Sequence, residues 1–469
     1  AAPGKRRGFL NGWCFGFGYF VFGLYWIGNA LLIDGNPYAW AWPLAVAGLP
    51  AALAFYPALA CMAMRWRPAG SLHARYGAYI GWMALSEWVR GHALTGFPWN
   101  LFGYTWADHL PLVQMVSFSN VYFLSLLTIG WAALPGFLLL ARPLADRRSL
   151  LLASLIAASF IVVYGYGALR LQQAILEPVE GLRVHIIQPN IPQAEKWQSE
   201  KMMDHFLTLL ALSEPTDDDP ALTTYIVWPE TALSYHLMGS PYARGVLRDT
   251  LSLYRGKVYL LTGMLRHDEQ GYYNSLVAID RKAEIVAIYD KAHLVPFGEY
   301  IPFQQWIPLA PIVAFSGFVA GPGPDNLVLP EEDGRLAPII CYEAIFPAGV
   351  VRRDAPRPDF IVNVTNDGWY GISPGPYQHL VSAQFRAVEE GIPLIRAANT
   401  GISAYIDGHG HIQSAAPLAS AQRLVVRPAR KTVVFQRSAP AENGVFLFLC
   451  FLFIYGNYIY YIRKNSLKL

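Results

Sequence analysis

The sequence predicts an α-helical membrane bundle with an α/β domain inserted before its last helix. Of the 469 residues, 54% are hydrophobic and only 15% are charged, whereas a soluble domain carries roughly 25% charged residues. The charges are unevenly placed, because 51 of the 69 lie between positions 171 and 443. This composition excludes a wholly soluble enzyme and a disordered chain, and four cysteines are too few for a disulfide scaffold. The net charge of +3 gives no reason to expect a nucleic-acid partner.

Six segments are candidates to cross a bilayer, which takes about 20 mainly apolar residues. They cover residues 8–33, 38–64, 75–92, 113–140, 149–170 and 444–462. We therefore expect an N-terminal bundle of five helices over 1–170, a polar domain over 171–443, and a last helix with its tail over 444–469. The third span is the weakest because Glu87 and Arg90 lie near its end. We favour an ion pair at the water interface over a functional intramembrane pair.

Basic residues predict the orientation, because cytoplasmic loops are enriched in Lys and Arg. There are four basic clusters. The first precedes span one, the second lies between spans two and three, the third lies between spans four and five, and the fourth follows span six. They consist of Lys5, Arg6, Arg7, Arg65, Arg67, Arg75, Arg142, Arg147, Arg148, Arg463, Lys464 and Lys468. With six spans all four clusters face the cytoplasm, so the polar domain is expected outside it. A cleaved signal peptide over 8–33 is disfavoured, since that span is long and four more follow.

The polar domain is expected to be α/β. Short apolar runs bounded by turn residues predict strands, and their uniform apolarity predicts a sheet covered on both faces. These runs are RVHIIQPN, TYIVWPE, KVYLLTGM, LVAID, EIVAIYDK, APIICYE, FIVNVTND and PLIRAAN. SEKMMDHFLTLLALS and YQHLVSAQFRAVEEG have helical patterns. Three runs end in polar residues, namely Glu230, Cys341 and Asn366–Asp367, and chemistry collects beyond the carboxyl ends of strands in such sheets.

Cys341 is the only cysteine of the polar domain, since Cys14, Cys61 and Cys450 lie inside predicted spans. From the count alone, a buried structural thiol is the first interpretation. A nucleophilic cysteine would need a base and a group that holds the oxyanion. His293 and His379 are available as bases. We find neither a Cys/His metal spacing nor a phosphate-cradling glycine loop, so no metal and no cofactor are expected.

Three segments shift the balance toward catalysis. VWPETA, DKAHLVPFGEYIP and ICYEAIFP together resemble the Glu–Lys–Cys constellation of the nitrilase superfamily. Together with the further segments IPQAEKW, NDGWYGISPGPYQH, GFPWN and FGFGYFVFGLYWI, the sequence is similar to the apolipoprotein N-acyltransferase family. The resemblance spans nearly the whole chain. It implies a nitrilase-like αββα sandwich inserted into the helical bundle. The family normally has eight spans, and the six here resemble its third to eighth. The chain begins with Ala rather than Met, and a shortened chain, an incomplete sequence and a true variant would all look alike.

The resemblance assigns three catalytic roles. Cys341 is the nucleophile, Glu230 the general base and Lys291 the oxyanion stabiliser. A nearby ammonium favours the thiolate and can later hold the oxyanion. The carboxylate would move the thiol proton to the leaving alcohol. The backbone N–H near Tyr342 is expected to complete the oxyanion site.

The resemblance also suggests supporting residues. Glu299 would hold the lysine, although a surface glutamate in a turn would look the same. Glu343 is expected near the nucleophile, or only in a salt bridge with an arginine, and Asn274 is a further supporting residue. Trp197 and Gln193 are expected in a lid or substrate-binding segment, with a core position as the alternative for Trp197. Trp99, with Phe97 and Trp106, is expected to form a lipid entry or an interfacial aromatic belt.

The reaction implied by the resemblance is ping-pong. Cys341 takes the sn-1 acyl chain of a phospholipid, expected to be phosphatidylethanolamine, and passes it to the amine of a diacylglyceryl-cysteine apolipoprotein. The protein would then be a multi-pass protein of the bacterial inner membrane, with its catalytic domain on the periplasmic side. One alternative is a membrane-tethered amidase that hydrolyses a small amide with the same triad. Another is a non-catalytic lipid- or lipoprotein-binding protein with a degenerate triad.

Overall fold

The computed structural model describes residues 4–65, 71–141, 146–174, 176–215, 222–302, 317–431 and 443–455. The chain divides into two compact units. The helical unit comprises Ala1–Tyr25, Pro43–Gln173 and Phe435–Leu469, and the sandwich unit comprises Trp26–Trp42 and Ala174–Val434. The short segment Trp26–Trp42, which follows the first apolar helix, therefore belongs to the sandwich unit.

The helical unit is built from apolar helices. They are α1 (Gly4–Leu24), α2 (Trp42–Leu53), α3 (Phe55–Ala63), α4 (Leu72–His92), α5 (Leu110–Val113), α6 (Val121–Ala141) and α7 (Arg147–Gln172), followed by an apolar helix over Asn443–Tyr455. Ser71 caps α4 and Asp146 caps α7, each accepting backbone N–H groups of the first turn.

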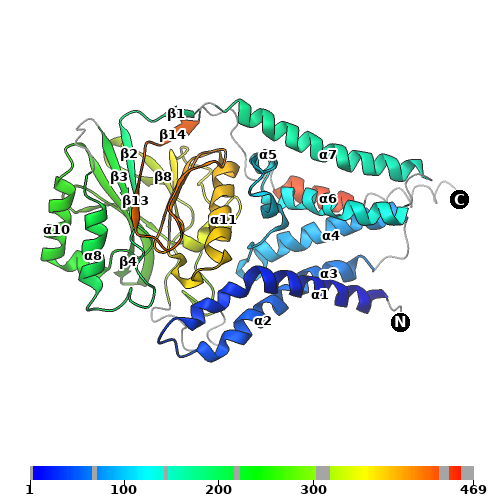
Figure 1. Ribbon diagram of the computed structural model, residues 1–469, viewed down its shortest axis with the longest axis horizontal. Coiled ribbons are helices and arrows are strands. Elements are labelled where there is room, and N and C mark those ends of the chain that lie inside the picture. The colour runs from blue at the N-terminus through cyan, green and yellow to red at the C-terminus, as the bar shows by residue number, and fades with distance from the viewer. Residues whose placement is uncertain are drawn as a thin grey trace. The chain divides into compact units, whose positions relative to one another are not determined.

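Four helical stretches of the described residues are long and apolar enough to cross a membrane, not the six we expected. They are Gly4–Leu32, Ala39–Ala63, Val121–Ala141 and Arg147–Gln172. The expected span 75–92 lies within α4 (Figure 1), a 21-residue helix that is less apolar because it carries charged residues. The expected span 444–462 forms a helix as far as Tyr455, and residues 456–462 lie outside the described residues.

The charged pair of α4 forms the expected ion pair, and it is buried within the protein rather than exposed to water. Glu87 and Arg90 are 4% and 2% exposed, and the Arg90 guanidinium is 3.0 Å from the Glu87 carboxylate. Arg90 also donates to the carbonyls of Phe97 and Trp99. Glu87 accepts the N–H of Phe102. The pair therefore fixes the aromatic loop by satisfying its backbone, which is how a buried ion pair is tolerated.

The sandwich unit contains two six-stranded sheets (Figure 1). In order across the first sheet, the strands are β13 (Gln422–Val426), β2 (Leu182–Gln188), β3 (Thr223–Val227), β4 (Val258–Asp268), β5 (Gly271–Ile279) and β6 (Ile285–Asp290). The second sheet orders β12 (Ile412–Ala415), β11 (Ala404–Ile406), β10 (Leu394–Ala398), β9 (Phe360–Thr365), β8 (Arg335–Ile340) and β7 (Leu327–Val328). A separate pair joins β1 (Leu176–Pro178) to β14 (Ala429–Lys431). All eight predicted strands are confirmed.

Alternation along the strands builds four layers. Tyr225 and Val227 of β3 face the second sheet in a shared apolar cluster with Val362 of β9. The intervening Ile226 packs instead with helices α8 (Met202–Leu212) and α10 (Pro241–Ser252). Helix α11 (Pro374–Glu390) covers the outer face of the second sheet. Figure 1 shows α8 and α10 on one side of the sheets and α11 on the other. The αββα sandwich is therefore confirmed.

The central strands of each sheet run parallel. Strands β2, β3 and β4 are parallel in the first sheet, and β8, β9 and β10 are parallel in the second. Neighbouring parallel strands have their carboxyl ends at the same edge of a sheet. The residues that follow β3 therefore lie at the carboxyl edge of the first sheet, and those that follow β8 and β9 lie at the carboxyl edge of the second.

Candidate active site

Cys341 occupies a strained turn directly after β8. Its φ is +50°, a left-handed conformation that is uncommon for a residue with a Cβ and that clusters at functional sites. The side chain is 6% exposed, and the Cys341 carbonyl lies 3.0 Å from the His379 Nε2. The strand-to-turn geometry therefore holds a buried thiol in one orientation.

Glu343 fixes this turn to the segment after Lys291. One carboxylate oxygen of Glu343 accepts the Ile340 N–H at 2.7 Å. The other accepts the N–H groups of Ala292 and His293 at 2.8 and 3.1 Å, together with the Tyr289 hydroxyl at 2.9 Å. Burial raises the pKa of Glu343, while these backbone donors oppose the rise. Glu343 therefore joins the two segments, and among the described residues no arginine forms an ion pair with it.

Glu230 follows β3 in a second strained turn. The next residue, Thr231, has a φ of +48°, and Gly263 of β4 backs this turn so closely that a Cβ there would lie 2.4 Å from the Glu230 Cα. The Glu230 carboxylate accepts from the Asn274 side-chain amide at 2.7 Å. It lies 3.6 Å from the Lys291 ammonium. The base position is therefore set from three strands, β3, β4 and β5.

Lys291 follows β6 and is 1% exposed. Its ammonium donates to Glu299 at 2.8 Å, and its backbone N–H donates to the Asn274 carbonyl at 2.8 Å. Burial by itself would lower the pKa of Lys291, but Glu299, Glu230 and the Cys341 thiolate raise it above the ordinary value. Lys291 is therefore a permanent cation at the site.

Glu299 and Asn274 connect the base to the lysine. The Asn274 amide bridges the Glu230 and Glu299 carboxylates at 2.7 and 2.9 Å, and the backbone bond from Lys291 to Asn274 ties the end of β6 to β5 at this point. The second oxygen of Glu299 accepts the Val295 N–H at 2.7 Å. The surface-turn alternative for Glu299 is therefore not what the structure shows, because this carboxylate is part of the site.

Electrostatics at the thiol differ from our expectation. Burial and the neighbouring Glu230 carboxylate raise the pKa of Cys341 to about 12, although Lys291 and a hydrogen bond with Thr365 oppose the rise. The lysine alone would favour the thiolate, but burying a second negative charge beside Glu230 carries a larger cost. At neutral pH the Cys341 side chain is therefore a thiol.

Both histidines named as possible bases make contacts with other groups. The two ring nitrogens of His379 lie 2.8 Å from the Asp367 carboxylate and 3.0 Å from the Cys341 carbonyl. The His293 ring stacks on Phe346 with centroids 3.9 Å apart. The role of Glu230 as the base stays a prediction.

A buried polar network behind Cys341 was only partly foreseen. Asp367, named as a strand-end residue, accepts from Arg396 at 2.7 Å and from Thr365 at 3.0 Å. Burial by itself would raise the pKa of Asp367, but Arg396 and His379 lower it to about 2. Arg396 was not predicted as a site residue, because it lies inside the apolar run PLIRAAN that predicts a strand. A charged residue within such a run was the signal that could have identified it.

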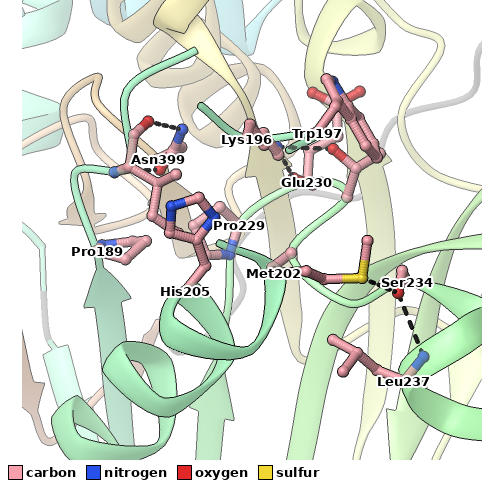
Figure 2. Close-up of a pocket in the computed structure, with 13 residues that line it drawn as sticks. Pro189, Lys196, Trp197, Met202, His205, Pro229, Glu230, Ser234, Leu237 and Asn399 are labelled. Atoms are coloured by element: carbon pink, nitrogen blue, oxygen red, sulfur yellow. Dashed lines mark hydrogen bonds between the residues drawn. The ribbon is translucent and has the colours of Figure 1, made fainter. Parts of the chain in front are cut away.

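A cavity of about 40 Å³ adjoins Glu230 (Figure 2). Trp197 and Lys196 lie beside Glu230 on one side of it. Gln193, predicted with Trp197 in a lid or binding segment, accepts from the Asn366 amide at 2.7 Å. The predicted lid role of these residues stays a prediction.

Two other predicted residues have simpler surroundings. The Tyr342 ring is 5% exposed and packs edge-on against Phe346, with centroids 5.2 Å apart. Trp99 belongs to the helical unit and is 2% exposed. Its ring stacks near Phe97. The backbone role expected near Tyr342 and the lipid-entry role expected for Trp99 stay predictions.

We expect Glu343→Gln to lower the rate at which iodoacetamide alkylates Cys341 about tenfold, because misplacing a reactive group by a fraction of an ångström is costly. The amide nitrogen of glutamine would face backbone N–H groups that now donate to a carboxylate. Glu284→Gln, at an exposed position, is the control. Parent-like alkylation of the Glu343 variant would contradict the positioning role.

Comparison with known proteins gives two family matches. Residues 183–432 match the carbon-nitrogen hydrolase model, and residues 1–134 match the apolipoprotein N-acyltransferase N-terminal domain. An apolipoprotein N-acyltransferase of Rhodopseudomonas palustris is 41% identical over 433 residues, covering 88% of this chain and 79% of the relative. One from Brucella melitensis is 44% identical, covering 86% and 76%. A solved carbon-nitrogen hydrolase superfamily protein from Xanthomonas campestris is 20% identical, with a TM-score of 0.39 and coverage of 57% and 94%.

Proposed function

The chain belongs to the apolipoprotein N-acyltransferase family, and we propose that it moves the sn-1 acyl chain of a phospholipid, through a thioester on Cys341, to the amine of a diacylglyceryl-cysteine apolipoprotein. As a member of this family it is an acyltransferase that acts on lipoproteins. The observation that carries the proposed route is the buried thiol with Glu230 and Lys291 beside it. Phosphatidylethanolamine is the proposed donor.

In the first half-reaction, the Cys341 sulfur attacks the ester carbonyl carbon. The S–H proton passes to the Glu230 carboxylate as the C–S bond forms, and Lys291 stabilises the negative charge that develops on the carbonyl oxygen. The C–O bond to glycerol then breaks, and Glu230 returns its proton to the leaving alkoxide. The products are the thioester and a lysophospholipid, so the protons balance within the site.

In the second half-reaction, the neutral amine of the lipoprotein attacks the thioester carbon. Its nitrogen gives a proton to Glu230 as the C–N bond forms. The C–S bond breaks, and the proton passes from Glu230 to the departing thiolate, which restores the Cys341 thiol. One base therefore serves both steps, because each step begins with a protonated nucleophile.

We further propose that the chain is a multi-pass protein of the bacterial inner membrane with its sandwich unit on the periplasmic side. Four apolar helical stretches support a membrane location. The basic clusters around the six segments predicted from the sequence support the orientation, because all four fall on one side if each segment crosses the membrane. Both substrates carry acyl chains whose extraction from a bilayer costs about 0.8 kcal/mol per CH₂, so a catalytic domain anchored at the membrane is favourable.

The test is to incubate the purified protein with acyl-labelled phosphatidylethanolamine and to measure the mass of Cys341-containing peptides. We expect one acyl group on Cys341, discharged as an amide when a diacylated lipopeptide is added. The Cys341→Ala variant should carry no acyl group. Hydrolysis of a small amide by a folded protein that forms no acyl adduct would favour the amidase alternative. Lipopeptide binding without any acyl product would favour the non-catalytic one.

A further inference from the structure

Lys196 is a second buried ammonium beside the base. It is 9% exposed, and its Nζ donates to the Glu230 carbonyl at 2.9 Å and to the Thr231 hydroxyl at 2.7 Å. Figure 2 shows Lys196 and Trp197 together with Glu230 at the edge of the cavity. Nothing in the two half-reactions above uses this charge.

The two hydrogen-bond acceptors of Lys196 are neutral. Within the described ranges, no carboxylate forms an ion pair with it, whereas Lys291 is paired with Glu299 at 2.8 Å. A buried cation without a contacting anion is costly, and burial lowers the pKa of Lys196 to about 8, while the charge of Glu230 opposes the drop.

The same ammonium clamps the backbone of the base. Thr231 has a φ of +48°, and the Glu230–Thr231 peptide is pressed from one side by Gly263, whose added Cβ would lie 2.4 Å from the Thr231 nitrogen. Lys196 holds both the carbonyl and the hydroxyl of this turn. The strained turn is thus fixed between a glycine and a charged side chain.

We infer that Lys196 is a positioning residue that fixes the Glu230–Thr231 turn and so holds the Glu230 side chain where it can take the Cys341 proton. Lys291 lies 3.6 Å from the Glu230 carboxylate, whereas Lys196 holds the backbone of the same turn. This inference rests on the proposed function, because it concerns the base of that reaction.

The split between kcat and KM gives the test. The hydrogen bonds of Lys196 go to the turn that carries Glu230, so removing them should misplace the base. A misplaced base slows proton transfer without weakening the binding of the donor.

We expect Lys196→Met to lower the rate of Cys341 acylation about 10- to 100-fold, because misplacing a catalytic group by about 1 Å can cost about 100-fold. The KM for phosphatidylethanolamine vesicles should stay unchanged. Lys196→Arg, which keeps donors for the turn, should recover part of the rate. The control is Lys282→Met, an exposed lysine in the turn between β5 and β6. A kcat equal to that of the parent would overturn the inference.

Two further measurements keep the outcome decisive. If Lys196→Met does not fold, Lys196→Gln is the second variant, and a kcat equal to that of the parent in it would overturn the inference. The rate of Cys341 alkylation by iodoacetamide needs no acyl transfer. If the parent forms no acyl adduct, slower alkylation of the Lys196 variants than of the parent would support the inference about Lys196 while the proposed function fails.

Discussion

Replacing Glu230 by glutamine should lower the rate of Cys341 acylation by at least about 100-fold, the lower end of what general-base catalysis contributes. With the pKa of Cys341 raised to about 12, only about one thiol in 10⁵ is ionised at pH 7. Glutamine keeps the shape and can still accept from the Asn274 amide, as the Glu230 oxygen does at 2.7 Å. It cannot take a proton, so the attack must wait for the rare thiolate.

The measurement is single-turnover acylation of Cys341 from labelled phospholipid, followed from pH 6 to pH 10. The rate of the glutamine variant should rise steadily with pH, because hydroxide then replaces the missing base, and the gap to the parent should narrow. Glu284→Gln is again the matched control at an exposed position. A variant with parent-like acylation at neutral pH would show that another group removes the thiol proton.

Strand ends were the most informative part of the sequence. Apolar runs that stop at a polar residue located Glu230 after β3 and Cys341 after β8, and the parallel pairing of the central strands explains why such ends meet. The family resemblance added Lys291 and Glu299, which no periodicity could pick out, since each lies in a loop among other polar residues. The two layers of helices followed from strands that are apolar on both faces.

The remaining features depend on distances that a sequence does not contain. The direction of the pKa shift at Cys341 depends on how deeply the thiol and Glu230 are buried together. The four hydrogen-bond donors of Glu343 are three backbone N–H groups and a tyrosine hydroxyl that is distant in the sequence. No sequence pattern marks such donors, so a salt bridge with an arginine was an equally open interpretation. The short strands β11, β12 and β14, of three or four residues, carry too few positions to show alternation.

The network behind Cys341 predicts the largest effect on stability. We expect Asp367→Asn to destabilise the sandwich unit by about 3–5 kcal/mol, because removing one partner leaves the buried charge of the other uncompensated. Asp367 is paired with Arg396 at 2.7 Å, and both side chains are fully buried. The apparent melting temperature, followed by tryptophan fluorescence in detergent, should fall by roughly 6 to 20 °C.

The pH dependence of this effect has a defined sign. The folded-state pKa of Asp367 is lowered to about 2, below the value near 3.9 of an unfolded aspartate. The stability that its ionisation contributes is therefore complete above about pH 4 and is lost as the pH falls toward 2, so the parent should lose more stability than Asp367→Asn over that interval. Asp354→Asn, where the aspartate is 73% exposed and pairs with Arg352, should change stability by less than about 0.5 kcal/mol. Equal losses in the two variants would mean that the buried charges behind Cys341 are compensated by other groups.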